Sequence, residues 1–137
     1  MIKWGIIGLG NMGNRFAEAI KEIKDVKINA IASSNKFKLH TFGKKFSISS
    51  ENCFGNYDQL IESNLIDAIY ISTLNNTHLD LIKKCAKFKK HILCEKPATI
   101  NENELNDIKK IISDSSVCFL EGIAFRSHPI VDELVKV

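Results

Sequence analysis

Residues 2–13 read IKWGIIGLGNMG, and this segment indicates the type of fold. Its first six residues are mostly apolar, as in a buried β-strand, and a glycine-rich turn follows directly. Phe16, Ile20 and Ile23 come next at helical spacing, with charged residues on the other face. The stretch therefore predicts a strand, a tight turn and the start of a helix.

The three glycines of this turn, Gly8, Gly10 and Gly13, form a GxGxxG pattern. We expect Gly8 to permit the tight turn, Gly10 to let the backbone approach a diphosphate, and Gly13 to allow close packing of helix on strand. The free N–H groups and the positive end of the helix would hold the phosphates. The pattern predicts a dinucleotide site because it lies between a strand and a helix. The alternative is a glycine-rich turn without a ligand.

Short apolar runs continue along the chain and alternate with helical patterns. Strands are expected over residues 26–32, near Ile48, and over residues 65–72, 91–94 and 117–120. Because such strands hide both faces only under helices, the alternation predicts an α/β fold with a doubly wound parallel sheet.

Three further helices are expected between these strands. One follows Asn35 as its cap and carries Leu39, Phe42 and Phe46, and a second runs from about 77 to 88. The third opens at Asn101 with the following features: Glu104 completes a capping box, and Ile100 and Leu105 occupy the two staple positions.

Composition excludes several classes of protein. The 137 residues are 45% hydrophobic and 26% charged, which suits one domain with a buried core. A net charge of +3 and the scarcity of arginine argue against nucleic-acid binding, and no apolar run is long enough to cross a membrane. The four cysteines contain no CxxC pair, and three lie in apolar runs. We therefore expect buried free thiols in a reducing cytoplasm, with neither a disulfide frame nor a metal site.

The segment after the second predicted strand, ASSNK over residues 32–36, bears on the choice of cofactor. NAD enzymes place an acidic residue near this point to bind the ribose hydroxyls. Here Ser33 and Ser34 stand instead, and Lys36 or Lys38 would attract a 2′-phosphate, so NADP is favoured over NAD. The alternative is that Ser34 or Asn35 merely caps the next helix, and both roles can coexist.

Several motifs, taken in order, resemble a known family. GxGxxG is followed by DAIYIST at 67–73, NNTH at 75–78, CEKP at 94–97 and EGIAFRSHP at 121–129. Together they resemble the Gfo/Idh/MocA oxidoreductases over essentially the whole chain. The resemblance implies an amino-terminal NAD(P)-binding Rossmann domain and the transfer of hydride between a nicotinamide cofactor and a sugar-like or alicyclic alcohol.

The resemblance also assigns site residues. Lys96 matches the catalytic lysine beside the nicotinamide. Cofactor contacts are implied for Gly8, Gly10, Asn11, Met12, Gly13, Ser33, Ser34, Thr73, Asn75, His78, Glu95, Lys96 and Arg126. Two positions depart from the family: Leu74 replaces a usual proline, and Ser34 stands where many NADP-using members have arginine.

A catalytic role for Lys96 is also indicated by its position and its chemistry, independently of the resemblance. It follows a predicted strand at the edge where doubly wound sheets bind their ligands. An ammonium group there can donate a hydrogen bond to a substrate hydroxyl and favour its alkoxide. Glu95 could pair with Lys96 or with the cofactor. The alternative for a lone Lys-Pro pair is a solvent-facing turn.

The carboxyl-terminal segment sets the expected domain limits. Residues 1–123 are expected to form the dinucleotide-binding domain, and residues 124–137 to begin the connection to a substrate domain that this chain lacks. Ile130, Leu134 and Val137 form an apolar stripe without a partner. We expect a truncated family member that associates with itself or with a partner chain carrying the missing domain. The alternative is a dinucleotide-binding module without turnover of its own.

Overall fold

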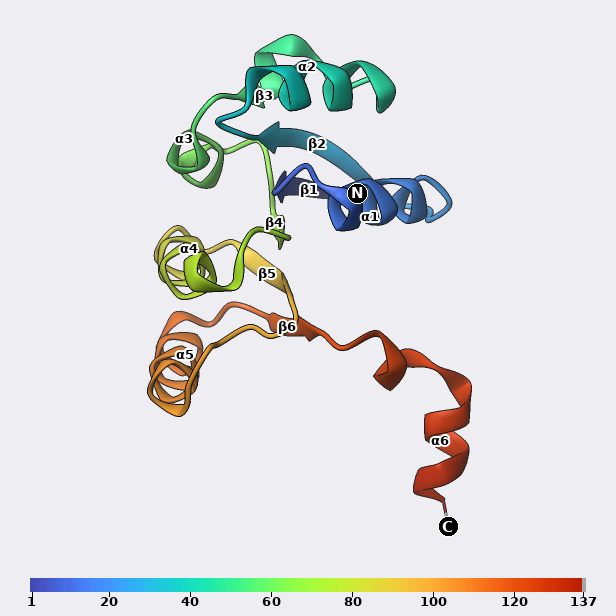
Figure 1. Cartoon of the computed structure of the whole chain (residues 1–137), viewed down its shortest axis with the longest axis vertical. Helices are drawn as coiled ribbons and strands as arrows, with labels where there is room; N and C mark the ends of the chain where they lie inside the picture. Colours follow the sequence, from blue (N-terminus) through green and yellow to red (C-terminus); the bar gives the residue numbers. More distant parts are fainter. Residues whose placement is uncertain (137) are drawn as a thin grey trace.

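The computed structural model describes residues 1–136 and contains a single six-stranded sheet (Figure 1). The strands are β1 (Ile2–Ile7), β2 (Val26–Ala32), β3 (Cys53–Phe54), β4 (Ala68–Ile71), β5 (His91–Glu95) and β6 (Phe119–Gly122). All neighbouring strands are parallel, in the order β3-β2-β1-β4-β5-β6. The chain order reverses between β1 and β4, which opens a crevice at the carboxyl ends of these two strands.

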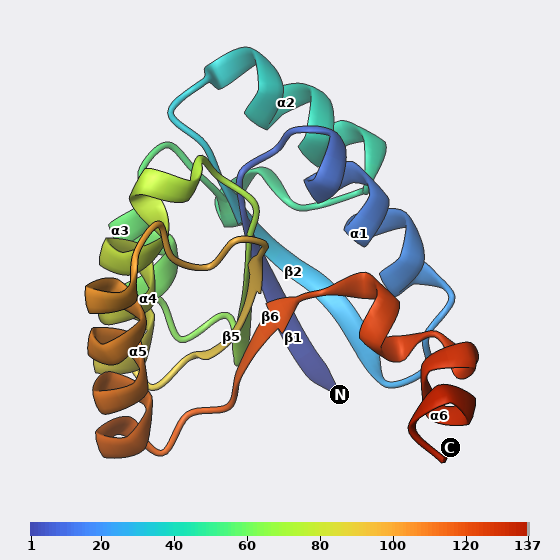
Figure 2. The same ribbon diagram turned by 60° about the horizontal axis from the view of Figure 1, so that its bottom comes forward.

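Helices cover both faces of this sheet (Figures 1 and 2). The helices of the described chain are α1 (Asn11–Lys21), α2 (Lys36–Lys45), α3 (Tyr57–Glu62), α4 (His78–Lys87), α5 (Glu102–Ser115) and α6 (Pro129–Val135), with short 3-10 turns η1 (Ser50–Asn52), η2 (Asn75–Thr77) and η3 (Ala124–Ser127). Helices α3, α4 and α5 pack on one face, and α1 and α2 pack on the other. The prediction of a doubly wound parallel sheet is confirmed.

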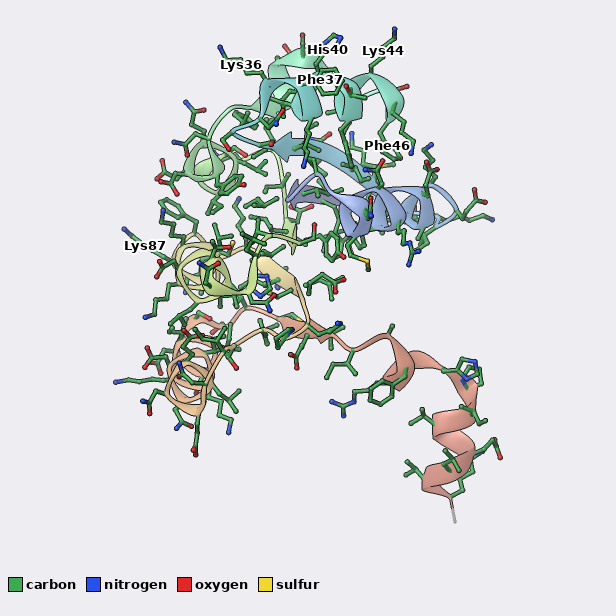
Figure 3. All side chains as sticks on the ribbon, viewed as in Figure 1. Lys36, Phe37, His40, Lys44, Phe46 and Lys87 are labelled. Atoms are coloured by element: carbon green, nitrogen blue, oxygen red, sulfur yellow. The ribbon has the colours of Figure 1, made fainter. Side chains whose placement is uncertain are left out.

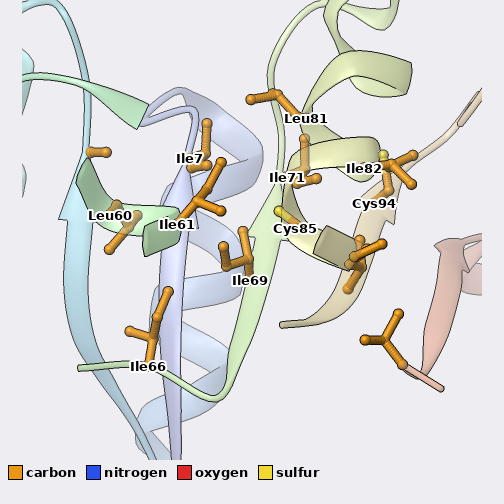
Figure 4. Packing of buried hydrophobic residues seen from close by; sticks show 14 of the residues in the cluster. Ile7, Leu60, Ile61, Ile66, Ile69, Ile71, Leu81, Ile82, Cys85 and Cys94 are labelled. Carbon is orange, nitrogen blue, oxygen red and sulfur yellow. The ribbon is translucent and has the colours of Figure 1, made fainter. Parts of the chain in front are cut away.

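Alternate residues of the central strands supply two apolar cores, one on each face. Ile7, Ile69 and Ile71 lie in the core under α3, α4 and α5 (Figure 4). Ile6 and Tyr70 lie in the other core, under α1 and α2. Fully burying a side chain such as Ile69 stabilises a fold by about 1.5–3 kcal/mol relative to leaving it exposed. This burial anchors β1 and β4, and with them the loops at the carboxyl edge.

The predicted helix caps are formed, with one difference. The Asn35 side chain accepts a hydrogen bond from the Lys38 amide at 3.0 Å, and the Asn101 side chain accepts one from the Glu104 amide at 2.9 Å. The Glu104 carboxylate reaches the amide of Ile100, rather than that of Asn101 as a capping box requires. The hydrophobic staple residues Ile100 and Leu105 are both exposed.

Other predictions about single elements were wrong. The third strand lies at Cys53–Phe54 rather than near Ile48, and β4 is shorter than the predicted run over 65–72. Ile23 lies beyond the end of α1 and is exposed. Helix α3 was not predicted; its six residues carry too little periodicity to identify, although Asn56 caps it by accepting a hydrogen bond from the Asp58 amide.

Burial of the cysteines also differs in part from the prediction. All four are free thiols. Cys85 and Cys94 are buried, and burial raises the pKa of each thiol to about 12. Cys53 is only partly buried and Cys118 is exposed. Among residues 1–136, no three His, Cys, Asp or Glu side chains gather as a metal site would require.

The carboxyl-terminal helix extends away from the sheet (Figure 1). In α6, Ile130 and Leu134 are 58% and 68% exposed, which agrees with a stripe that lacks a partner within the described chain. The third residue of that predicted stripe, Val137, lies outside the described residues. No helix in residues 1–136 has the length and apolar character needed to cross a membrane.

Candidate dinucleotide-binding site

The glycine turn between β1 and α1 is too tight for side chains at two of its three glycines. Gly8 has a φ of +97°, and a Cβ atom there would lie 2.5 Å from the Ser72 carbonyl carbon. A Cβ atom at Gly13 would lie 2.4 Å from the Gly8 carbonyl oxygen. At Gly10, by contrast, nothing lies within 4 Å of that position. The turn is therefore tightly packed against the protein at Gly8 and Gly13, and open at Gly10.

Ser72 fixes this turn from the neighbouring strand. Its hydroxyl donates a hydrogen bond to the Gly8 carbonyl oxygen at 2.7 Å, and its amide donates to the Ile7 carbonyl oxygen at 2.8 Å. Ser72 was not among the predicted site residues. Its position directly after a buried strand was visible in the sequence, but its contact with Gly8 spans 64 residues and depends on the register of β1 and β4.

The start of helix α1 suits an anion. Gly10 occupies the N-cap position and offers no side chain, and the first turn contains no acidic residue. By contrast, asparagine side chains cap α2, α3 and α5. The first amides of α1 thus remain available, and the helix dipole adds a partial positive charge. With the open space at Gly10, this turn fits the diphosphate of a dinucleotide.

A groove of about 380 Å³ extends from this turn toward β2 and η2, and we call it the glycine groove. It is lined by Gly8, Leu9, Gly10, Ser33, Ser34, Asn35, Lys38, Tyr57, Ser72, Thr73, Leu74 and Thr77. Ser33 is 7% exposed, and its hydroxyl accepts a hydrogen bond from the Asn35 amide at 3.1 Å. Ser34 and Lys38 are exposed, and none of the described lining residues is acidic.

A second cavity, of about 490 Å³, lies at the carboxyl ends of β5 and β6, and we call it the lysine groove. It is lined by Met12, Glu95, Lys96, Pro97, Glu121, Gly122, Ile123, Ala124 and Phe125. Lys96 is exposed and Glu95 is half-buried. Met12 comes from the first turn of α1, so both grooves meet at the glycine turn.

Two side chains that were not predicted as site residues shape the lysine groove. The buried Tyr70 hydroxyl donates a hydrogen bond of 2.5 Å to the Glu95 carboxylate. Burial, and then the Glu95 carboxylate, raise the pKa of Tyr70 above its usual range, so its proton stays available to Glu95. The Glu121 carboxylate accepts a hydrogen bond from the Ala98 amide at 2.8 Å. Glu95 and Glu121 thus have fixed positions.

The segment from Thr73 to His78 divides between the groove and the interior. Thr73 lines the glycine groove, whereas Asn75 is exposed in η2 and lines neither groove. His78 is fully buried. Its Nδ1 atom lies 3.0 Å from the Pro97 carbonyl oxygen and its Nε2 atom 3.3 Å from the Thr73 carbonyl oxygen. The structure therefore places His78 beneath the groove surface.

The remaining predicted residues lie at the margins. Asn11 opens α1 and is exposed, and Gly13 is buried against the turn. Arg126 is exposed in η3 and lines neither groove. The structure thus brings together the glycine turn, Ser34, Thr73, and the pair Glu95 and Lys96, while Asn75 and Arg126 lie apart from the grooves.

Another cavity, of about 420 Å³, lies elsewhere, between α2 and β3. Lys36, His40 and Lys44 extend from α2 beside it (Figure 3), and Cys53 lines its inner side. Burial raises the pKa of the Cys53 thiol above its usual range. This cavity shares no lining residue with either groove.

Comparisons with known proteins identify the family to which this sequence is similar. Residues 2–123 match the model of the Gfo/Idh/MocA family, described as an oxidoreductase family with an NAD-binding Rossmann fold. A myo-inositol 2-dehydrogenase of Thermotoga maritima is 35% identical over 111 residues, which are 81% of this chain and 32% of that protein. A scyllo-inositol 2-dehydrogenase (NADP(+)) of Bacillus subtilis is 27% identical over 136 residues, which are 99% of this chain and 41% of that protein.

A solved structure has a similar fold. The crystal structure of scyllo-inositol dehydrogenase from Lactobacillus casei with bound NAD(H) and scyllo-inositol has a TM-score of 0.90 and 26% identity, and the match covers 99% of this chain and 41% of that one. The chain thus spans well under half the length of these relatives. By its family match, its parallel sheet and its glycine turn, this chain belongs to the Gfo/Idh/MocA oxidoreductases.

Proposed function

We propose that this chain is the cofactor-binding part of an NAD(P)-dependent oxidoreductase that acts on a sugar-like or alicyclic alcohol or its carbonyl form. The observation that carries the proposal is the junction of the two grooves at the uncapped start of α1. In this proposal residues 1–123 bind the dinucleotide, and residues 124–137 begin the connection to a substrate domain. The inositol dehydrogenases to which the chain is similar support the substrate class.

The two grooves divide the dinucleotide between them. The amides at the start of α1 would hold the diphosphate, with Gly10 leaving room for it. The adenosine half would lie in the glycine groove, beside Ser34 and Thr73, and the nicotinamide half in the lysine groove. When bound, the nicotinamide supplies or accepts the hydride.

Lys96 and Glu95 would act on the substrate side. The Lys96 ammonium group, at the exposed surface of the lysine groove, can donate a hydrogen bond to the substrate oxygen and stabilise its developing negative charge. Glu95, held by the Tyr70 hydroxyl, supplies a fixed carboxylate next to Lys96. In the protein with its substrate domain, Lys96→Ala should abolish reduction of a polyol ketone while cofactor affinity stays within about threefold.

We further propose that NADP is the preferred cofactor. Ser34, Asn35 and Lys38 are exposed polar residues at the adenosine end of the glycine groove, where no described lining residue is acidic. A 2′-phosphate would approach Lys38 and the start of α2, which has no acidic residue in its first turn. An acidic residue at position 34 would repel that phosphate.

Calorimetric titration of the chain with NADPH and with NADH tests both proposals. Ser34→Asp should weaken NADPH binding by about tenfold or more and leave NADH binding within about threefold. Ser113→Asp makes the same change on the exposed surface of α5, away from both grooves, and should alter neither affinity. Failure of the folded parent chain to bind either dinucleotide at millimolar concentration would refute the proposed function. Equal affinity for both in the parent would refute only the preference for NADP.

A further inference from the structure

The two grooves are bordered by loops that each have their own internal support. In the loop after β4, the Thr73 and Thr77 hydroxyls lie 2.7 Å apart, and the Thr77 hydroxyl donates to the Leu74 carbonyl oxygen at 2.7 Å. In the loop after β5, the Ala98 amide donates to Glu121. Neither of these contacts joins one loop to the other.

His78 joins the two loops. One ring nitrogen faces the Thr73 carbonyl oxygen, in the loop that borders the glycine groove. The other faces the Pro97 carbonyl oxygen, next to Lys96 in the lysine groove. Among residues 1–136, no other side chain has hydrogen-bond contacts with both loops. A rigid ring between two main-chain oxygens fixes the distance between the loops.

The chemistry of the ring strengthens this interpretation. His78 is fully buried, so water does not replace either contact. A neutral imidazole has one N–H group and donates to one acceptor, whereas an imidazolium donates to both. Both partners are main-chain carbonyl oxygens, which only accept, so each contact is a hydrogen bond when the ring nitrogen that faces it carries the proton; the Nδ1 contact is the shorter, 3.0 Å against 3.3 Å.

We propose that His78 is a positioning residue that couples the two grooves, so that a dinucleotide bound in the glycine groove meets Lys96 at the correct distance. The proposal rests on the proposed function and adds to it a role that differs from direct contact with the cofactor. A ligand that spans both grooves should depend on His78, whereas a ligand confined to the glycine groove should not.

Two probes separate these cases. The first is whichever of NADPH and NADH the parent chain binds more tightly, and the second is the corresponding ADP-ribose fragment, which lacks the nicotinamide. In His78→Leu, we expect the dissociation constant of the dinucleotide to rise about tenfold and that of the fragment to stay within about twofold. Equal losses for both probes, or no loss for either, would overturn the proposal.

Two conservative variants show which contact matters more. In His78→Asn the amide nitrogen can replace Nδ1 and keep the contact with Pro97, whereas in His78→Gln it can replace Nε2 and keep only the contact with Thr73. Both should bind the dinucleotide with intermediate affinity, and His78→Asn should lie closer to the parent. A matched control is His91→Leu, which removes the contact between a histidine Nδ1 atom and the Cys118 amide at the far end of β5 and should leave the ratio of the two affinities unchanged.

Hydrogen exchange without ligand gives an independent readout. In His78→Leu the amides of Thr77 and Ala98, one in each loop, should exchange about fivefold faster, while the amide of Ile71 within the sheet keeps its protection. Unchanged exchange at both loops would contradict the coupling. A parent chain that binds no dinucleotide, but whose loops loosen together in the variant, would refute the proposed function and retain the coupling.

Discussion

The glycine groove is shaped mainly by backbone, whereas the lysine groove is shaped by side chains. Gly8 and Gly13 leave no room for a Cβ atom, and the start of α1 offers amides without a side-chain cap. In the lysine groove, Glu95 takes its position from Tyr70, and the loop after Lys96 takes its position from Glu121. The difference implies that the glycine groove tolerates substitution least, and that the lysine groove can lose contacts without losing the fold.

Gly8→Ala should destabilise the chain more than any other variant described below. The new Cβ atom would meet the Ser72 carbonyl group at 2.5 Å, and the φ of +97° is unfavourable for any L-residue with a side chain. We expect the free energy of unfolding to fall by roughly 2–4 kcal/mol. Urea denaturation followed by the fluorescence of Trp4 measures the change. A loss below about 1 kcal/mol would show that the turn is not constrained by Ser72.

Gly10→Ala should separate binding from stability at the same turn. Nothing lies within 4 Å of the added Cβ atom, and the backbone at Gly10 has a negative φ, so the free energy of unfolding should change by less than about 1 kcal/mol. The dissociation constant for the dinucleotide should rise at least about tenfold, because the methyl group occupies the approach to the α1 amides. Tight binding by this variant would place the diphosphate elsewhere.

Tyr70→Phe probes the lysine groove. The ring can keep its stacking on Phe16, where the centroids are 4.1 Å apart, but the hydrogen bond to Glu95 is lost. We expect the free energy of unfolding to fall by about 1–1.5 kcal/mol near neutral pH. If the dinucleotide is divided between the grooves as proposed, the whole dinucleotide should bind this variant more weakly, whereas binding of the ADP-ribose fragment should not change. A fragment affinity that falls as far as that of the whole dinucleotide would contradict the division between the grooves.

The same variant has a defined pH dependence. Burial and Glu95 raise the pKa of Tyr70 in the folded chain above its unfolded value of about 10, so the folded state holds this proton more tightly. The parent should therefore lose stability as the pH rises above about 10, and Tyr70→Phe should lose less over the same range. Parallel stability curves for the two proteins above pH 10 would contradict this sign.

The sequence predicted best what depends on local backbone requirements. The glycine turn has a strand before it and a helix after it. The GxGxxG pattern predicts the conformational or spatial requirement at each glycine. The asparagine caps at Asn35 and Asn101 could be predicted for the same reason, since a cap involves neighbours three residues apart. Elements too short to show hydrophobic periodicity, such as the two-residue β3 and the six-residue α3, were not located correctly from the sequence.

Contacts between distant segments could not be predicted from the pattern. Tyr70 has the spacing of a core residue and does lie in the core, but its hydroxyl reaches Glu95, 25 residues away, only through the register of β4 and β5. His78 matches a cofactor loop by resemblance, yet its place at the start of α4 buries it beneath that loop. Residue type and order indicate which chemistry is present, while strand register decides which groups touch.

Asn101→Ala changes a residue at the start of α5, outside both grooves, and should affect stability alone. Its side chain accepts a hydrogen bond from the Glu104 amide at 2.9 Å, so its removal should lower the free energy of unfolding by about 1 kcal/mol. Asn101→Asp keeps the acceptor and should retain most of that stability. Neither variant should alter the affinity for the dinucleotide or its fragment in calorimetric titration. Asn101→Ala could instead weaken dinucleotide binding as much as Tyr70→Phe does. The weaker binding of Tyr70→Phe would then reflect a general loss of stability. The hydrogen bond between Tyr70 and Glu95 would not be needed for binding in the lysine groove.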